Sequence, residues 1–99
     1  MVDDGRVKLS DEEIQEGLAG LPGWALGDGE IEKQYVLADF REAMAFIVRV
    51  AFEAEAANHH PDIDIRWNRV RIALATHSEH AITTNDLELA AIIERLASG

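Results

Sequence analysis

The stretch Ile63-Asp-Ile-Arg-Trp-Asn-Arg-Val-Arg-Ile-Ala-Leu74 alternates large apolar side chains with polar or small ones on both sides of Asn68-Arg69. Such alternation is typical of β-strands with one buried face, and two runs joined by two residues predict a β-hairpin. The apolar side chains then share one face, and a slip by one residue would expose them to water. The expected cross-strand pairs are Trp67 with Val70, Ile65 with Ile72, and Ile63 with Leu74.

Extended outward, the same pairing brings His60 opposite His77. Residues directly opposite each other on a ladder have Cβ atoms about 5 Å apart. Pro61 lacks a backbone N–H and should fray the ladder, so we expect the two imidazoles to lie close together without forming a regular pair. His59 falls at the end of the helix predicted before the hairpin, so the sequence predicts three imidazoles in one region.

Histidine is the side chain that most readily serves as acid and base near neutral pH. Glu55 precedes His59 by one helical turn, in the favourable acid-before-base order, and we expect it to orient His59. A single histidine at a helix end is usually a cap, and one at a strand end is usually polar surface. The prediction of a site therefore depends on the convergence of three.

The composition describes one globular domain, residues 1–99, with 47% hydrophobic residues. The net charge of −10 argues against direct nucleic-acid binding, and no apolar run is long enough to span a membrane. The polar start Met1–Arg6 does not resemble a secretory signal. Zero cysteines exclude thiol chemistry and a disulfide scaffold, and suit a cytoplasmic protein.

The other elements follow from caps and periodicity. A capping box of Ser10 and Glu13 predicts a first helix, and two short runs around Gly27-Asp28-Gly29 predict a second hairpin. Asp39 caps a long helix that extends to about Asn58, and Thr83, with Asp86 at its third position, opens the last helix. The expected inward stripe of the long helix is Phe40, Ala43, Met44, Ile47, Ala51 and Ala54.

The element order is therefore αββαββα. Two hairpins joined by a helix predict an α+β fold with one four-stranded antiparallel sheet and helices packed on one face. Phe52 falls among charged residues of the long helix, with Val48 at the edge of its apolar stripe. Such exposed apolar residues are either harmless or mark a subunit contact.

Seven positions stand at the spacing E-x3-H-H-P-x5-W-x9-H-x8-D, from Glu55 to Asp86. This spacing resembles the signature of the pterin-4a-carbinolamine dehydratases, and the likeness extends to the Ser10 helix start, the Gly23-Trp24 pair and the long helix. The resemblance implies loss of water from 4a-hydroxytetrahydrobiopterin to give the quinonoid dihydropterin, in tetrahydrobiopterin recycling for aromatic amino-acid hydroxylases. It implies no metal and no bound cofactor.

The resemblance also implies site residues and partners. His59, His60 and His77 would be catalytic, Glu55 and Asp86 supporting or orienting, and His60, Pro61, Trp67 and Thr76 would contact the pterin. A capping role would by itself explain Asp86. The family is usually a homotetramer built from dimers, so a homo-oligomer is expected, and its eukaryotic members also serve as dimerisation cofactors of a homeodomain transcription factor.

The chemistry suits these residues, because hydroxide leaves poorly without a proton and the ring N–H must lose one as the C=N bond forms. We expect His59 and His77 to share the acid and base roles, and His60 to hold the pterin. His80 departs from the family pattern and is either a loop residue or an extra polar group at the site mouth.

Two alternatives stay open. His59, His60, His77, His80 and Asp62 could instead ligate zinc, although adjacent histidines rarely point at one ion. The fold could also serve as a non-catalytic coactivator or assembly module, because fold does not determine function.

Overall fold

The structure is a computed structural model that describes residues 7–98, so the predicted absence of a leader at Met1–Arg6 lies outside the described residues. The chain order confirms the predicted αββαββα arrangement, with one short 3₁₀ helix added at His77–Glu79. The elements are α1 (Asp11–Leu18), β1 (Ala25–Gly27), β2 (Glu30–Val36), α2 (Phe40–Ala57), β3 (Asp62–Arg66), β4 (Arg69–Leu74) and α3 (Thr84–Ser98).

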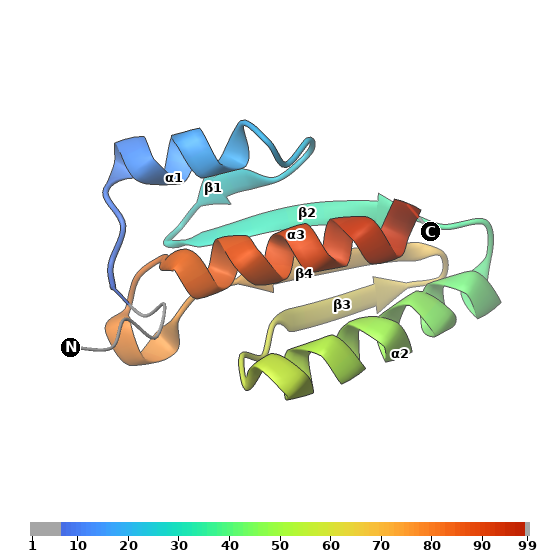
Figure 1. Ribbon diagram of the computed structural model, residues 1–99. Helices are drawn as coiled ribbons and strands as arrows, with labels where there is room; N and C mark the ends of the chain where they lie inside the picture. Colours follow the sequence, from blue (N-terminus) through green and yellow to red (C-terminus); the bar gives the residue numbers. More distant parts are fainter. Residues whose placement is uncertain (1–6, 99) are drawn as a thin grey trace.

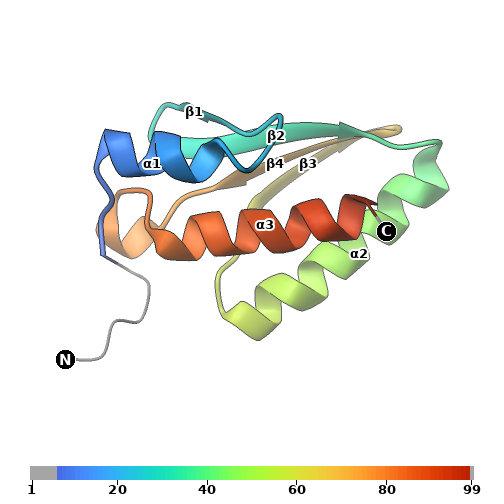
Figure 2. The same cartoon turned by 45° about the horizontal axis from the view of Figure 1, so that its top comes forward.

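The strands form one antiparallel sheet in the order β1-β2-β4-β3. The helices lie on one side of this sheet (Figures 1 and 2), which confirms the predicted two-layer α+β fold. The core fills the space between the layers, with Ile31, Val70 and Ile72 from the sheet and Phe46, Val50 and Ile93 from the helices almost fully buried.

The predicted register of the hairpin formed by β3 and β4 is wrong by two residues. Arg66 pairs with Arg69, and Ile65 with Val70, so the connection is Trp67-Asn68 and not Asn68-Arg69. Trp67 lies in the turn with φ of 54° and is 68% exposed. Because a slip by two residues leaves every side chain on its own face, the apolar pattern could not distinguish the two registers.

The register also changes the argument for the histidines. The β3–β4 ladder ends at Asp62 and Ala73, and His77 belongs to the 3₁₀ helix, so His60 and His77 do not face each other across a ladder. Their proximity has to come from the connections that follow and precede the strands.

The buried face of the long helix overlaps the predicted one only in part: Ala43 and Ala54 are buried as predicted, but Ala51 is exposed. Ala43, Phe46, Val50 and Ala54 are its buried residues, whereas Phe40 and Met44, predicted to point inward, are exposed. Apolar residues occur all around α2, so the period of 3.6 alone did not select the buried stripe. The exposed apolar residues Phe40, Met44, Val48 and Phe52 follow one another at intervals of four.

Two predicted helix starts are confirmed. Ser10 and Glu13 form a reciprocal capping box at α1, and Asp39 accepts a hydrogen bond from the Glu42 N–H at the start of α2. Over residues 7–98, none of the helices combines the length and the apolar character that crossing a bilayer requires.

Candidate active site

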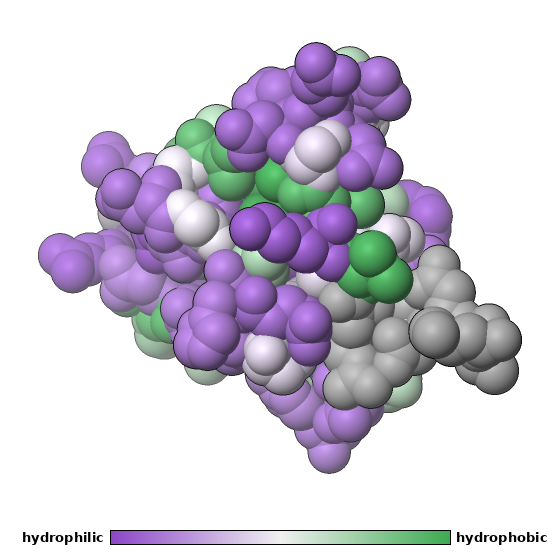
Figure 3. Space-filling view, turned by 90° about the vertical axis from the view of Figure 1, so that its left-hand side faces the viewer, coloured by the Kyte–Doolittle hydropathy of each residue, from purple (hydrophilic) through white to green (hydrophobic). Residues whose placement is uncertain are grey.

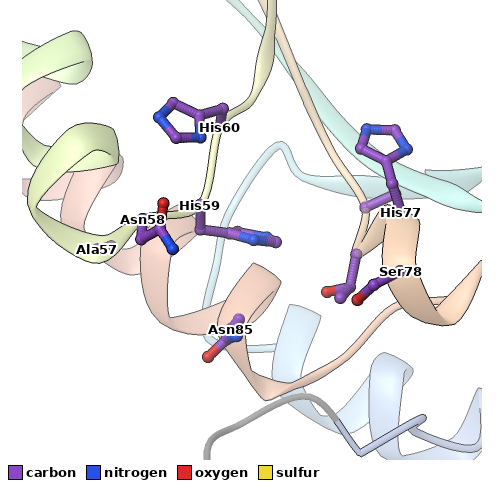
Figure 4. A pocket seen from close by; sticks show the side chains of 9 residues that line it. Ala57, Asn58, His59, His60, His77, Ser78 and Asn85 are labelled. Carbon is purple, nitrogen blue, oxygen red and sulfur yellow. The ribbon is translucent and has the colours of Figure 1, made fainter.

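Three segments of the sequence meet at one end of the molecule and line an open cavity of about 470 Å³. They are the α2–β3 connection, the end of β4 with the 3₁₀ helix, and the first turn of α3. The lining residues are Ala57, Asn58, His59, His60, Ala75, Thr76, His77, Ser78 and Asn85 (Figure 4). Most of the surface at the end that carries the 3₁₀ helix is hydrophilic (Figure 3).

The end of α2 places the two adjacent histidines. Asn58 adopts a left-handed conformation (φ 51°, ψ 43°), and the His59 N–H bonds back to the Ala54 carbonyl at 3.0 Å. Asparagine tolerates this conformation better than most residues. The chain therefore leaves the helix before His59, and the two imidazoles take separate directions.

His59 is the buried member of the pair. Its side chain is 11% exposed, and its Nε2 lies 2.5 Å from Oδ1 of Asp86, which is fully buried. In Figure 4 the ring of His59 extends from the α2–β3 connection toward the wall that carries His77 and Ser78. A carboxylate behind an imidazole fixes the orientation and tautomer of the ring.

Asp86 is held by donors on its other oxygen. Oδ2 accepts hydrogen bonds from the Thr83 N–H at 2.9 Å and from the Thr76 hydroxyl at 2.8 Å. The first contact is the predicted helix cap, which is confirmed. A buried carboxylate needs such partners, and the N-terminal turn of α3 also favours its negative charge.

Glu55 contacts a different histidine from the predicted one. Its Oε1 lies 2.8 Å from Nε2 of His60, and both side chains are more than half exposed. The prediction that Glu55 orients His59 is wrong, because an i, i+4 contact requires the helix to continue to His59, whereas α2 ends at Ala57. An exposed pair of this kind contributes little to stability.

His77 reaches the cavity from the opposite wall, at the start of the 3₁₀ helix, and is exposed. His59, His60 and His77 thus line one cavity, as the sequence predicted. His80 has a left-handed backbone and lines a different hollow beside Leu9 and Ile14, so it is not a group at the mouth of this cavity.

The predicted substrate contacts separate into three cases. Thr76 lines the cavity, but its hydroxyl is bonded to Asp86 and Thr83. Pro61 is not among the lining residues. Trp67 lies in the turn at the other end of the hairpin, away from the cavity.

Sequence reasoning missed Asn58, Ser78 and Asn85, which also line the cavity. Each is a single polar residue near an element boundary, where polar residues are common for reasons of capping and turn formation. No pattern in the sequence sets them apart.

The described part of the chain contains no group of three or more His, Cys, Asp or Glu side chains arranged to hold a metal ion. The zinc site formed by His59, His60, His77, His80 and Asp62 therefore has no support in the geometry.

The chain is similar to several known proteins. A family model described as "Pterin 4 alpha carbinolamine dehydratase" matches residues 7–96. A Chloroflexus aurantiacus protein named "Putative pterin-4-alpha-carbinolamine dehydratase" is 53% identical over 89 residues, which cover 90% of this chain and 96% of that protein. An Acidobacterium capsulatum protein of the same name is 52% identical over 89 residues, covering 90% and 97%.

Several solved structures are similar, and two of them are described here. One is a transcriptional coactivator/pterin dehydratase from Brucella melitensis, with a TM-score of 0.89 and 34% identity, covering 92% of this chain and 99% of that one. The other is a pterin dehydratase-like protein identified as a RuBisCO assembly factor in the alpha-carboxysome, with a TM-score of 0.67 and 21% identity, covering 78% and 92%. The second likeness concerns the fold alone.

Proposed function

The chain belongs to the pterin-4a-carbinolamine dehydratase family, and we propose that it removes water from 4a-hydroxytetrahydrobiopterin to give the quinonoid dihydropterin. The observation that carries this proposal is the shared cavity of His59, His60 and His77, one of which is backed by a buried carboxylate. The proposed setting is the cytoplasm, in the recycling of the pterin used by aromatic amino-acid hydroxylases.

The reaction requires two proton movements at one ring system. The C4a–O bond breaks and the oxygen takes a proton to leave as water, while the neighbouring ring N–H gives up its proton as the C=N bond forms. No net proton is consumed, so a pair of imidazoles, one charged and one neutral, can perform both steps. Each such proton transfer typically contributes about 10²–10⁴-fold to the rate.

His59 suits the base. If its Nε2–H donates to Asp86, Nδ1 is left as the acceptor of the ring, and the buried carboxylate stabilises the imidazolium that forms. His77 suits the acid, because it is exposed and can regain a proton from solvent after each turnover. His60, steadied by Glu55, would hold the pterin or its 4a-oxygen.

Thr76 would act by supporting Asp86 in addition to forming the cavity wall. Pro61 stays a predicted neighbour of the pterin, through its place beside His60. A contact from Trp67 of the same chain is not part of this proposal, because its side chain lies at the far end of the hairpin.

A turnover assay tests the proposal directly. Purified protein is mixed with freshly generated carbinolamine, and dehydration is followed by absorbance against a buffer blank. We expect dehydration far above the blank, and loss of most of the enhancement in the His59→Ala variant. A rate equal to that in buffer would overturn the enzymatic role and favour a non-catalytic binding module.

The exposed apolar residues of α2 support a second role, as a subunit contact. Phe40, Met44, Val48 and Phe52 are 52%, 39%, 47% and 71% exposed, and a continuous stripe of this kind is unusual for a surface that only meets water. We propose that it joins copies of this chain into a dimer or tetramer. Light scattering after size exclusion should give a multiple of 11.0 kDa, and a Phe52→Glu variant should shift toward the monomer; a monomeric parent protein would overturn this.

A further inference from the structure

Thr83 stands at the N-cap of α3, but its hydroxyl does not cap the helix. An N-cap hydroxyl ordinarily accepts a hydrogen bond from the backbone N–H two or three positions later. Thr83 Oγ1 instead lies 2.6 Å from Thr76 Oγ1, which is its partner among the described residues. The cap is made in the other direction only, by Asp86 accepting from the Thr83 N–H.

The number of protons that each group can donate determines the direction of each hydrogen bond in this cluster. A hydroxyl has one proton to donate, and an ionised carboxylate can only accept. The Thr76 hydroxyl gives its proton to Asp86 Oδ2, so the hydrogen bond between the two threonines is donated by Thr83. The result is a series of two hydrogen bonds, in which Thr83 donates to Thr76 and Thr76 donates to Asp86.

This series of hydrogen bonds ends on the carboxylate that contacts His59. Thr83 and Asp86 are fully buried, Thr76 is 3% exposed and the His59 side chain is 11% exposed. Hydrogen bonds in such a setting polarise one another and are stronger than in water. With Oδ2 held by two donors, rotation of the carboxylate is restrained and Oδ1 stays directed at His59.

We propose that Thr83 is a positioning residue that acts through Thr76 and Asp86 to hold His59 in a single tautomer. Its effect on turnover rests on the proposed dehydratase function, but its effect on the imidazole does not. A merely structural role for Thr83 would change stability and leave the proton positions of His59 as they are.

The test compares Thr83→Val, which keeps the shape and removes the hydroxyl, with Thr83→Ser, which restores it. Thr84→Val is the matched control, because Thr84 is the next residue, at the start of α3, and takes no part in the hydrogen bonds that join Thr83, Thr76 and Asp86. Long-range proton–nitrogen NMR of the His59 ring reports the tautomer without any substrate. We expect the Nε2–H form in the parent, Thr83→Ser and Thr84→Val proteins, and a mixture of tautomers in Thr83→Val.

Turnover gives the second measurement. Loss of one hydrogen bond of ordinary strength predicts a fall in kcat of about 3- to 10-fold in Thr83→Val, with KM unchanged, and recovery in Thr83→Ser. If Thr83 acts through Asp86, the same change made in an Asp86→Asn background should cost little more, because coupled residues are not additive. Should Thr83→Val fold poorly by circular dichroism, Thr83→Ala provides the same comparison.

A His59 ring that keeps the parent tautomer in Thr83→Val would overturn the inference, as would a full additive loss in the double variant. These outcomes are separate from the fate of the dehydratase proposal. A parent protein without turnover would contradict the function, while the NMR comparison would still decide the role of Thr83.

Discussion

His59 and Asp86 are 27 residues apart in the chain, yet their side chains meet at 2.5 Å beneath the floor of a cavity. The contact joins the end of α2 to the first turn of α3. The buried carboxylate of Asp86 therefore has two roles: it accepts the capping hydrogen bond at the start of α3 and it contacts the imidazole of His59.

Replacement of Asp86 by asparagine should therefore reduce both activity and stability. The amide keeps one oxygen as an acceptor, but its nitrogen faces a group that donates in the parent protein. One buried hydrogen bond is then lost unless His59 changes its tautomer, at a cost of about 1–3 kcal/mol in the free energy of unfolding. Loss of the preferred tautomer of His59 should lower kcat by between about 10²- and 10⁴-fold. Steady-state kinetics and urea unfolding measure the two effects, and an Asp86→Asn protein with parental kcat would refute the backing role.

The three cavity histidines should differ in their effects on turnover. We expect His59→Ala and His77→Ala to lower kcat by about 10²–10⁴-fold, as for removal of a general acid or base. His60→Ala should cost only about 2- to 10-fold, the range of a binding hydrogen bond. His80→Ala, which alters a different hollow, is the control. Equal and small losses in all the variants would contradict this assignment.

The exposed partner of His60 should matter little. Glu55 is 81% exposed, and exposed ion pairs are commonly worth between about 0 and 1 kcal/mol. We expect Glu55→Gln to change kcat by less than about 5-fold and to leave the unfolding midpoint nearly unchanged. A loss as large as that of Asp86→Asn would mean that Glu55 takes part directly in proton transfer.

Glu94 predicts a dependence of stability on pH. Burial raises its pKa, but hydrogen bonds from Lys33, Tyr35 and Trp24 outweigh this and hold the pKa below the ordinary value of 4.5. A carboxylate with a lowered folded-state pKa stabilises the fold above pH 4.5, and this contribution is lost as the pH falls through the folded pKa.

The Glu94→Gln variant should thus be less stable than the parent at pH 7, and the difference should shrink below pH 4.5. Thermal unfolding across this range measures it. Glu88→Gln, on an exposed position of the same helix, serves as the control. A difference that stays constant down to pH 2 would show that shape and not charge is responsible.

Trp67 predicts a stabilising substitution. Its φ of 54° lies in the left-handed region, which raises the free energy of a residue with a side chain by about 1–2 kcal/mol and that of glycine by almost nothing. Because the side chain is 68% exposed, Trp67→Gly should raise the free energy of unfolding by about 0.5–1 kcal/mol. Trp67→Ala should bring no gain, since it keeps the strain. Destabilisation by both variants would point to a packed role for the indole.

Much of the fold follows from local signals in the sequence. The capping box of Ser10 and the cap at Asp39 mark helix starts by residue type, and the alternation around Asn68 marks a hairpin. The register was not predictable in the same way, because alternation repeats every two residues and a bulky residue at a glycine-favoured turn position goes against turn preferences.

The sequence predicted which histidines form the site better than it predicted which carboxylates they contact. His59, His60 and His77 could be selected as a group, and they line one cavity. Their carboxylate partners could not be assigned, because the assignment depends on where α2 ends. One left-handed residue, Asn58, turns the chain so that Glu55 meets His60 and leaves His59 to Asp86.

The left-handed turn at Asn58 also gives the adjacent imidazoles of His59 and His60 different access to solvent: the first is nearly buried and the second is exposed. Small buffer molecules can approach His60 and His77 freely, but they cannot enter the space that the ring of His59 fills against Asp86. Added free imidazole should accordingly restore much of the lost rate when His77 is truncated to alanine, and less when His59 is, because the space left by His59 is reached only through the cavity. Chemical rescue would then tell apart a proton carried in from bulk solution and a proton kept within the protein.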